Sequence, residues 1–60
     1  MEKQRFATVT GIQMDIVTIQ YTDTDEIAKL PLSIMPDGVK EGDRILVWFE
    51  IKIIKIIKAR

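Results

Sequence analysis

Apolar and polar residues alternate along several short stretches of this 60-residue chain. Residues 5–12 are the first such stretch, with Ala7 and Val9 on one face and Phe6 on the other. A period of two residues is the pattern of a β-strand. Gly11 interrupts the run and predicts a bulge or a close approach of the backbone.

Two shorter strands are expected next. Residues 16–21 alternate in the same way, and residues 27–30 form a brief third stretch that ends at Pro31. Turns are expected at residues 13–15 and at the polar, acidic residues 22–25, because Asp and Thr side chains bond to nearby backbone groups.

The middle of the chain is dominated by prolines and glycines. Pro31 and Pro36 bracket four residues, which leaves room for one helical turn at most, because a residue that precedes proline avoids the α region. We expect a turn at residues 36–38 with Pro36 at its first central position, and a second at residues 40–43 in which Gly42 supplies a positive φ.

Residues 44–50 give the strongest strand pattern. Their apolar side chains divide between two faces, with Ile45, Val47 and Phe49 on one and Leu46 and Trp48 on the other. Because both faces are apolar, we expect both to be at least partly covered.

The last ten residues, 51–60, fit two patterns. On a helical wheel their isoleucines and lysines separate into two faces, but Ile is only a middling helix former and a ten-residue helix is marginal, so a strand is favoured. A straight strand over residues 44–58 would be about 50 Å long at about 3.3 Å per residue, which is too long for this domain. The chain must therefore bulge, bend or form a hairpin near residues 50–52.

These elements predict an all-β fold. Eleven isoleucines, four valines and five threonines make one third of the chain β-branched, which suits a pleated sheet. We expect one domain, residues 1–60, built as a small SH3-like meander of four or five strands with a one-turn helical segment between strands three and four. Closure into a barrel would hide the open strand edges.

Composition limits the chemistry. The chain has no cysteine and no histidine, which excludes a disulfide, a Cys/His zinc site, a cysteine nucleophile and histidine general-base catalysis. We expect no enzyme activity, cofactor or metal. No apolar run approaches the roughly 20 residues that span a bilayer. The charged start of the chain does not match a secretory signal, so a cytoplasmic location is expected. Abundant Ile and Lys, with no Asn, are compatible with a thermophilic source.

A Leu-Pro step followed by two turns carries a resemblance to a known family. The matching positions are Leu30, Pro31, Pro36, Asp37, Gly38, Gly42 and Asp43. With the preceding hairpin, they resemble the DUF3006-type family of short bacterial and archaeal proteins of unknown function, over roughly residues 8–47. The Ile/Lys-rich end departs from that family, whose ends tend to be acidic. The resemblance implies a small β-barrel and no activity.

Three acidic residues, Asp23, Asp25 and Glu26, suggest a calcium loop at first sight. An EF-hand loop that began at Asp23 would need Gly at its sixth position and Glu at its twelfth, where this chain has Ala28 and Ile34. We therefore expect a solvated acidic turn.

A pair of carboxylates and a pair of glycines also do not match a known type of functional site. Glu41 and Asp43 are expected in a surface turn, which lacks the cleft that a pair of carboxylates needs for acid–base catalysis. Gly38 and Gly42 lack the lysine and the following helix of a phosphate-binding loop.

Charge is distributed unevenly. Residues 1–50 contain five basic and nine acidic side chains, whereas residues 51–60 contain four basic and none acidic. The basic end has three functional interpretations: a surface for nucleic acid, an amphipathic segment on an anionic membrane, or a strand that pairs with another chain. The simpler interpretation, a closing strand with a lysine-lined edge, is preferred.

Two hypotheses of function follow. The first is a non-catalytic interaction module that forms a homodimer or docks to a protein partner through its apolar end and the Trp48 face. The second is a weak nucleic-acid binder. The candidate binding residues for both are Trp48, Lys52, Lys55, Lys58 and Arg60. A sequence pI near 6.1 counts against the second hypothesis.

Overall fold

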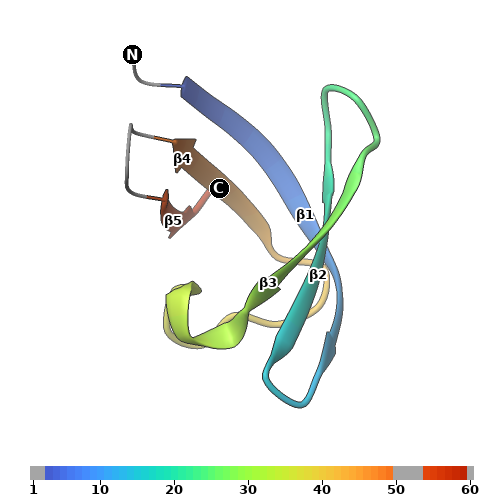
Figure 1. Ribbon diagram of the computed structural model, residues 1–60, viewed down its shortest axis with the longest axis vertical. Helices are drawn as coiled ribbons and strands as arrows, with labels where there is room; N and C mark the ends of the chain where they lie inside the picture. The colour runs from blue at the N-terminus through green and yellow to red at the C-terminus, as the bar shows by residue number, and fades with distance from the viewer. Residues whose placement is uncertain (1–2, 50–53, 60) are drawn as a thin grey trace.

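The computed structural model describes residues 3–49 and 54–59. They form five antiparallel strands and one 3₁₀ turn. In chain order these are β1 (Lys3–Gln13), β2 (Ile16–Tyr21), β3 (Ile27–Pro31), η1 (Leu32–Ile34), β4 (Arg44–Phe49) and β5 (Ile54–Lys58), shown in Figure 1. The expected all-β class and the single helical turn between the third and fourth strands are confirmed.

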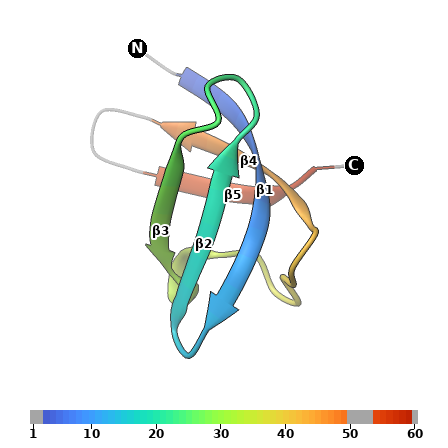
Figure 2. The same ribbon diagram turned by 90° about the vertical axis from the view of Figure 1, so that its right-hand side faces the viewer.

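The strands form one sheet in the order β3-β2-β1-β4-β5. The expected meander holds for β1, β2 and β3, but β4 pairs with β1 and not with β3. Three hairpin-connected strands and a fourth that returns beside the first make a Greek key. In Figure 2, β4 and β5 run crosswise to β2 and β3, so the sheet is strongly curved. Within the described residues, β3 and β5 remain its two edges, and the expected barrel closure by strand pairing is not seen.

The long first strand links the two halves of the sheet. Its first half pairs with β4 from Lys3 to Thr8, and its second half pairs with β2 from Ala7 to Gln13. A register shift between Val9 and Gly11 confirms the predicted bulge. A Cβ at Gly11 would meet no atom within 4 Å, so the alternative prediction, a close approach of the backbone, is not seen.

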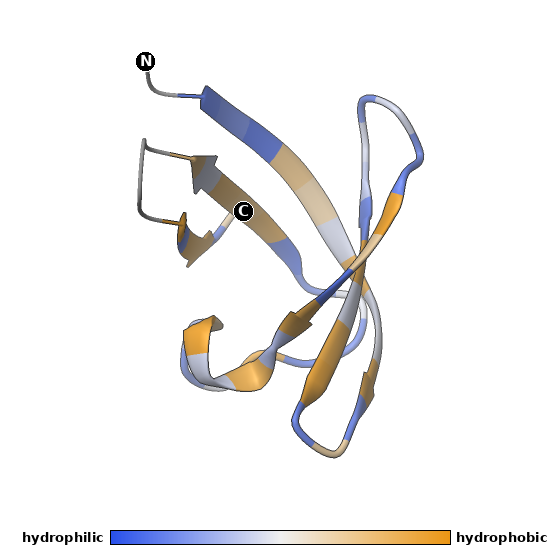
Figure 3. Cartoon of the chain, viewed as in Figure 1, coloured by the Kyte–Doolittle hydropathy of each residue, from blue (hydrophilic) through white to orange (hydrophobic). Residues whose placement is uncertain are grey.

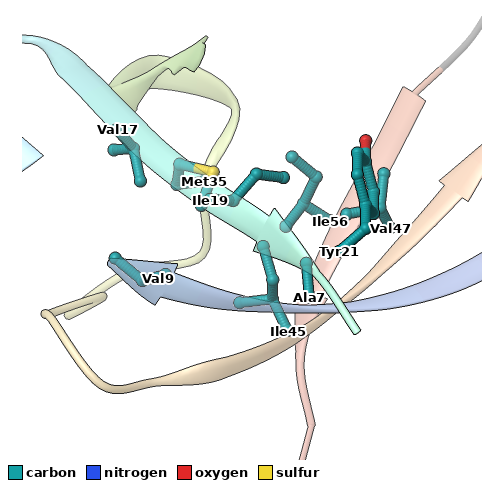
Figure 4. Packing of buried hydrophobic residues seen from close by; sticks show 9 residues of the cluster. All are labelled: Ala7, Val9, Val17, Ile19, Tyr21, Met35, Ile45, Val47 and Ile56. Atoms are coloured by element: carbon teal, nitrogen blue, oxygen red, sulfur yellow. The ribbon is translucent and has the colours of Figure 1, made fainter. Parts of the chain in front are cut away.

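The core lies on the concave side of the curved sheet (Figure 4). Every strand except β3 contributes fully buried or nearly buried apolar residues, and Met35, just after η1, covers them. The members are Ala7, Val9, Val17, Ile19, Tyr21, Met35, Ile45, Val47 and Ile56. The predicted alternation in β1, β2 and β4 is confirmed.

One of the two prolines differs from expectation. The third strand ends at Pro31 as predicted, with Pro31 itself the last residue of β3 and opposite Ile16. Val39 N donates to Pro36 O at 3.3 Å, so Pro36 is the first residue of its turn and not the first central one. Gly38 then occupies the second central position with a φ of 74°, where glycine is favoured.

Residues 54–58, the larger described part of the chain end, form a strand. Ile54 lies opposite Phe49, and β5 runs antiparallel to β4, so the chain reverses direction between them. The expected hairpin position, residues 50–52, lies outside the described residues. Among the residues described, no helix is long and apolar enough to cross a membrane.

Candidate interaction surface

The convex face of the sheet, opposite the core, has an ordered grid of side chains. Strand register places Leu46 between Phe6 on β1 and Ile57 on β5, so the three residues form one row across three strands. The adjacent row has Trp48 between Gln4 and Lys55. We call Phe6, Leu46, Trp48 and Ile57 the outer-face patch.

The outer-face patch remains accessible to solvent although it is apolar. Phe6 is 43% exposed and Ile57 is 50% exposed, while Leu46 and Trp48 on β4 are half-buried. The expected partial cover of Leu46 and Trp48 is thus confirmed. Contiguous apolar residues at the surface are typical of interaction sites.

Trp48 takes part in the outer-face patch through its apolar ring and not through its polar N–H group. Its indole Nε1 is buried and has no hydrogen-bond acceptor among residues 3–49 and 54–59. A buried donor without a partner costs free energy. The ring is therefore held by packing, and no polar contact orients it.

Cations border the outer-face patch. The Arg44 guanidinium lies 4.7 Å from the centroid of the Phe6 ring, and Lys55 lies directly opposite Trp48. No strand residue that the structure describes is acidic; the described carboxylates are all in turns. Figure 3 shows the hydrophilic colouring of the turn between β2 and β3.

The structure separates the lysines that the sequence grouped together. Lys55 shares the outer face with Trp48, but Lys58 lies opposite Ile45 and so is on the core side. Its Nζ is 3.7 Å from Asp43 Oδ2, which makes it a partner of the turn before β4. Lys52 and Arg60, the other two candidates, lie outside the described residues.

The acidic turn between β2 and β3 has a structural partner, Arg5. The Arg5 guanidinium donates to Thr24 Oγ1 at 2.9 Å, pairs with Glu26 at 3.5 Å and lies 3.8 Å from the centroid of the Tyr21 ring. It also pairs with Asp23, and the hydrogen bonds from Arg5 lower the pKa of Asp23 below its ordinary value. Burial raises the pKa of Tyr21.

Arg5 was not among the residues expected to have a role. Its place opposite Val47 brings it to the open end of the core face, beside Tyr21. Only the pairing of β1 with both β2 and β4 creates this arrangement, so alternation along β1 could not reveal it. In the described part of the chain, no cluster of three or more carboxylates is arranged to hold a metal ion.

An open depression of about 350 Å³ lies at the turn between β1 and β2. Its lining residues are Gln13, Met14, Asp15, Ile16, Thr18 and Lys29. Met14 at its rim is 89% exposed. The polar groups of its lining are one carboxylate, one amine, one hydroxyl and one amide, from Asp15, Lys29, Thr18 and Gln13.

No protein-family model matches this chain, and no curated protein matches it. The resemblance to DUF3006-type proteins therefore stays a prediction.

Proposed function

We propose that this chain is a non-catalytic interaction module that self-associates or docks to a protein partner through the outer-face patch. The observation that carries the proposal is the row of Phe6, Leu46 and Ile57 across three strands, with both end residues about half exposed. Aromatic and aliphatic side chains on a rigid sheet are the usual anchors of protein interfaces. The lack of cysteine and histidine supports the non-catalytic part, and the lack of cysteine favours the cytoplasm.

Within the all-β class, we propose two small-barrel architectures for this chain. One is the SH3-like barrel expected from the sequence. The other is the OB fold, a five-stranded and partly open Greek-key barrel. The Greek-key order of β1 to β4 supports the second.

Sedimentation equilibrium over a wide concentration range tests the self-associating form. We expect Ile57→Ser to weaken association at least about tenfold, which corresponds to about 1.4 kcal/mol. An equal effect of Phe6→Ser would assign the contact to the face of the sheet, and no effect of Phe6→Ser would assign it to the β5 side. Ile27→Ser is the matched control, because Ile27 is 68% exposed but lies on β3, away from the patch. A wild-type chain that stays monomeric up to about 1 mM would exclude self-association.

Nucleic-acid binding is the second candidate, favoured by the outer face with its cations and without described carboxylates. Single-stranded nucleic acid is bound by basic groups beside aromatic rings, and Arg44, Lys55 and the Phe6 ring provide both. An amide NMR titration with oligonucleotides at low and high salt tests it. Salt-sensitive shifts at these residues, weakened by Lys55→Glu and not by Lys40→Glu, would support binding. An unchanged spectrum at low salt would exclude it.

A further inference from the structure

The two edge strands of the sheet, β3 and β5, differ in whether their free backbone groups can pair with a strand of another chain. In an antiparallel pair, residues alternate between those whose backbone groups bond to the neighbouring strand and those whose groups point away. One hydrogen bond fixes the phase of β5: Ala59 N donates to Arg44 O at 2.8 Å. Lys55 and Ile57 are therefore bonded to β4, and Ile54, Ile56 and Lys58 direct their N–H and C=O groups away from it.

The edge at β3 is protected. Tyr21 N donates to Glu26 O at 2.8 Å, so Ile27, Lys29 and Pro31 are the residues of β3 whose backbone faces outward. Pro31 has no N–H to donate, and Lys29 lies at the middle of the edge. Both features are known to prevent pairing at a sheet edge.

The edge at β5 is self-complementary. When a second β5 is placed antiparallel with Ile56 opposite Ile56 of the second copy, Ile54 lies opposite Lys58. All three outward-facing residues then meet outward-facing residues, so every free N–H and C=O of this edge has a partner. In the same register each lysine of β5 faces an isoleucine, which avoids directly opposed like charges. A shift of two residues toward the start of β5 would place Lys55 opposite Lys55.

We propose that a second copy of this chain adds to β5 in this antiparallel register, with the two-fold axis at Ile56. The proposal deepens and rests on the self-associating form of the proposed function. Strand addition to a free edge is an established mode of recognition, in which backbone hydrogen bonds supply affinity. Within the part of the chain that the structure describes, no backbone group bonds to the outward side of β5.

The pairing joins the two outer-face patches. Ile57 lies beside Lys55 of the second copy, so the row of Phe6, Leu46 and Ile57 continues into the second copy's row of Lys55, Trp48 and Gln4. The dimer thus presents one continuous row across both sheets, in which Lys55 and Gln4 are the polar members. The exposed side of Ile57 is covered at the junction, which gives the edge contact a side-chain contribution.

Proline substitution on the two edges tests the proposal. Lys58→Pro removes an outward N–H that none of the five described strands of the same copy uses, so the fold should persist and dimerisation should be lost or weakened at least about tenfold. Lys58→Ala removes the side chain and its contact with Asp43 but keeps the N–H, so it should dimerise like the wild type. Lys29→Pro is the matched change on β3 and should also leave the dimer intact.

Amide hydrogen exchange gives a readout without substitution. At concentrations where the wild type is dimeric, the amides of Ile56 and Lys58 should be protected, and dilution should release them, while that of Lys29 exchanges quickly throughout. A Lys58→Pro chain that is folded and dimerises like the wild type would overturn the proposal. So would a dimer in which the amides of Ile56 and Lys58 stay unprotected.

The same experiments distinguish the β5 edge dimer from self-association through the outer-face patch. If Phe6→Ser abolishes the dimer and Lys58→Pro does not, self-association uses the outer face and the edge register is wrong. If the wild type is monomeric at all concentrations, both the edge dimer and the self-associating form fail.

Discussion

Arg5 donates two hydrogen bonds to Asp23, with Nε 3.2 Å from Oδ2 and Nη2 3.1 Å from Oδ1. The two residues are eighteen positions apart, so this pair connects the first strand to the turn between β2 and β3. A planar, two-point contact between guanidinium and carboxylate is the stronger form of an ion pair. The pair closes the open end of the core beside Tyr21.

Acid should weaken this contact. Because the folded pKa of Asp23 lies below its ordinary value of 3.8, the pair stabilises the fold above that value, and this stability is lost as the pH falls through the lowered folded pKa. We expect Asp23→Asn to lower the melting temperature at pH 7, and the difference from the wild type to shrink toward pH 2. Asp25→Asn is the control, since Asp25 makes no ion pair among the described residues. A difference that is constant with pH would refute this role.

Met14 should be replaceable with a gain in stability. It has a φ of 56° in the turn between β1 and β2 and is 89% exposed, so it is strained and packs against little. A left-handed conformation costs a non-glycine residue about 1–2 kcal/mol, partly offset by the roughly 0.5–1 kcal/mol that glycine loses in entropy. Met14→Gly should raise the free energy of unfolding by about 0.5–1 kcal/mol in urea denaturation. Asp15→Gly, without a positive φ to relieve, should not.

Gly42 and Gly11 form a matched pair for backbone strain. A Cβ at either position would meet no atom within 4 Å, so crowding does not distinguish them. Gly42 has a φ of 89°, whereas Gly11 has no positive φ. We expect Gly42→Ala to cost about 1–2 kcal/mol. Gly11→Ala should be neutral or stabilising by up to about 1 kcal/mol. Equal effects in thermal unfolding would contradict this assignment.

Ile19 and Ile27 test where the core ends. Ile19 is fully buried in β2, and Ile27 is 68% exposed on β3. Ile19→Ala should cost about 2–5 kcal/mol, a large part of the stability of so small a domain. Ile27→Ala should change stability by less than about 0.5 kcal/mol. Urea unfolding at constant pH measures both, and a large loss for Ile27→Ala would mean that the edge at β3 is covered in solution.

The local pattern of the sequence determined the strands and most of the core. Alternation placed Val17, Ile19 and Tyr21 on one face of the second strand. It placed Ile45 and Val47 on one face of the fourth strand, and all five residues are buried in the core. Proline and glycine spacing determined the short helical turn and the turn at Gly42, because φ restrictions act within a few residues. Composition alone also excluded a disulfide, a Cys/His zinc site and catalysis by cysteine or histidine, because the chain has neither residue.

Tertiary structure decided what depends on pairing between distant segments. Only the return of β4 to β1 brings Phe6 beside Leu46 and replaces the expected meander with a Greek key. The pattern of residues 51–60 was ambiguous locally, and pairing with β4 identifies residues 54–58 as a strand. That pairing also sends Lys55 and Lys58 to opposite faces, since neighbouring strand residues alternate while a helix would group them. Strand register is a property of two segments together, and no single stretch of sequence contains it.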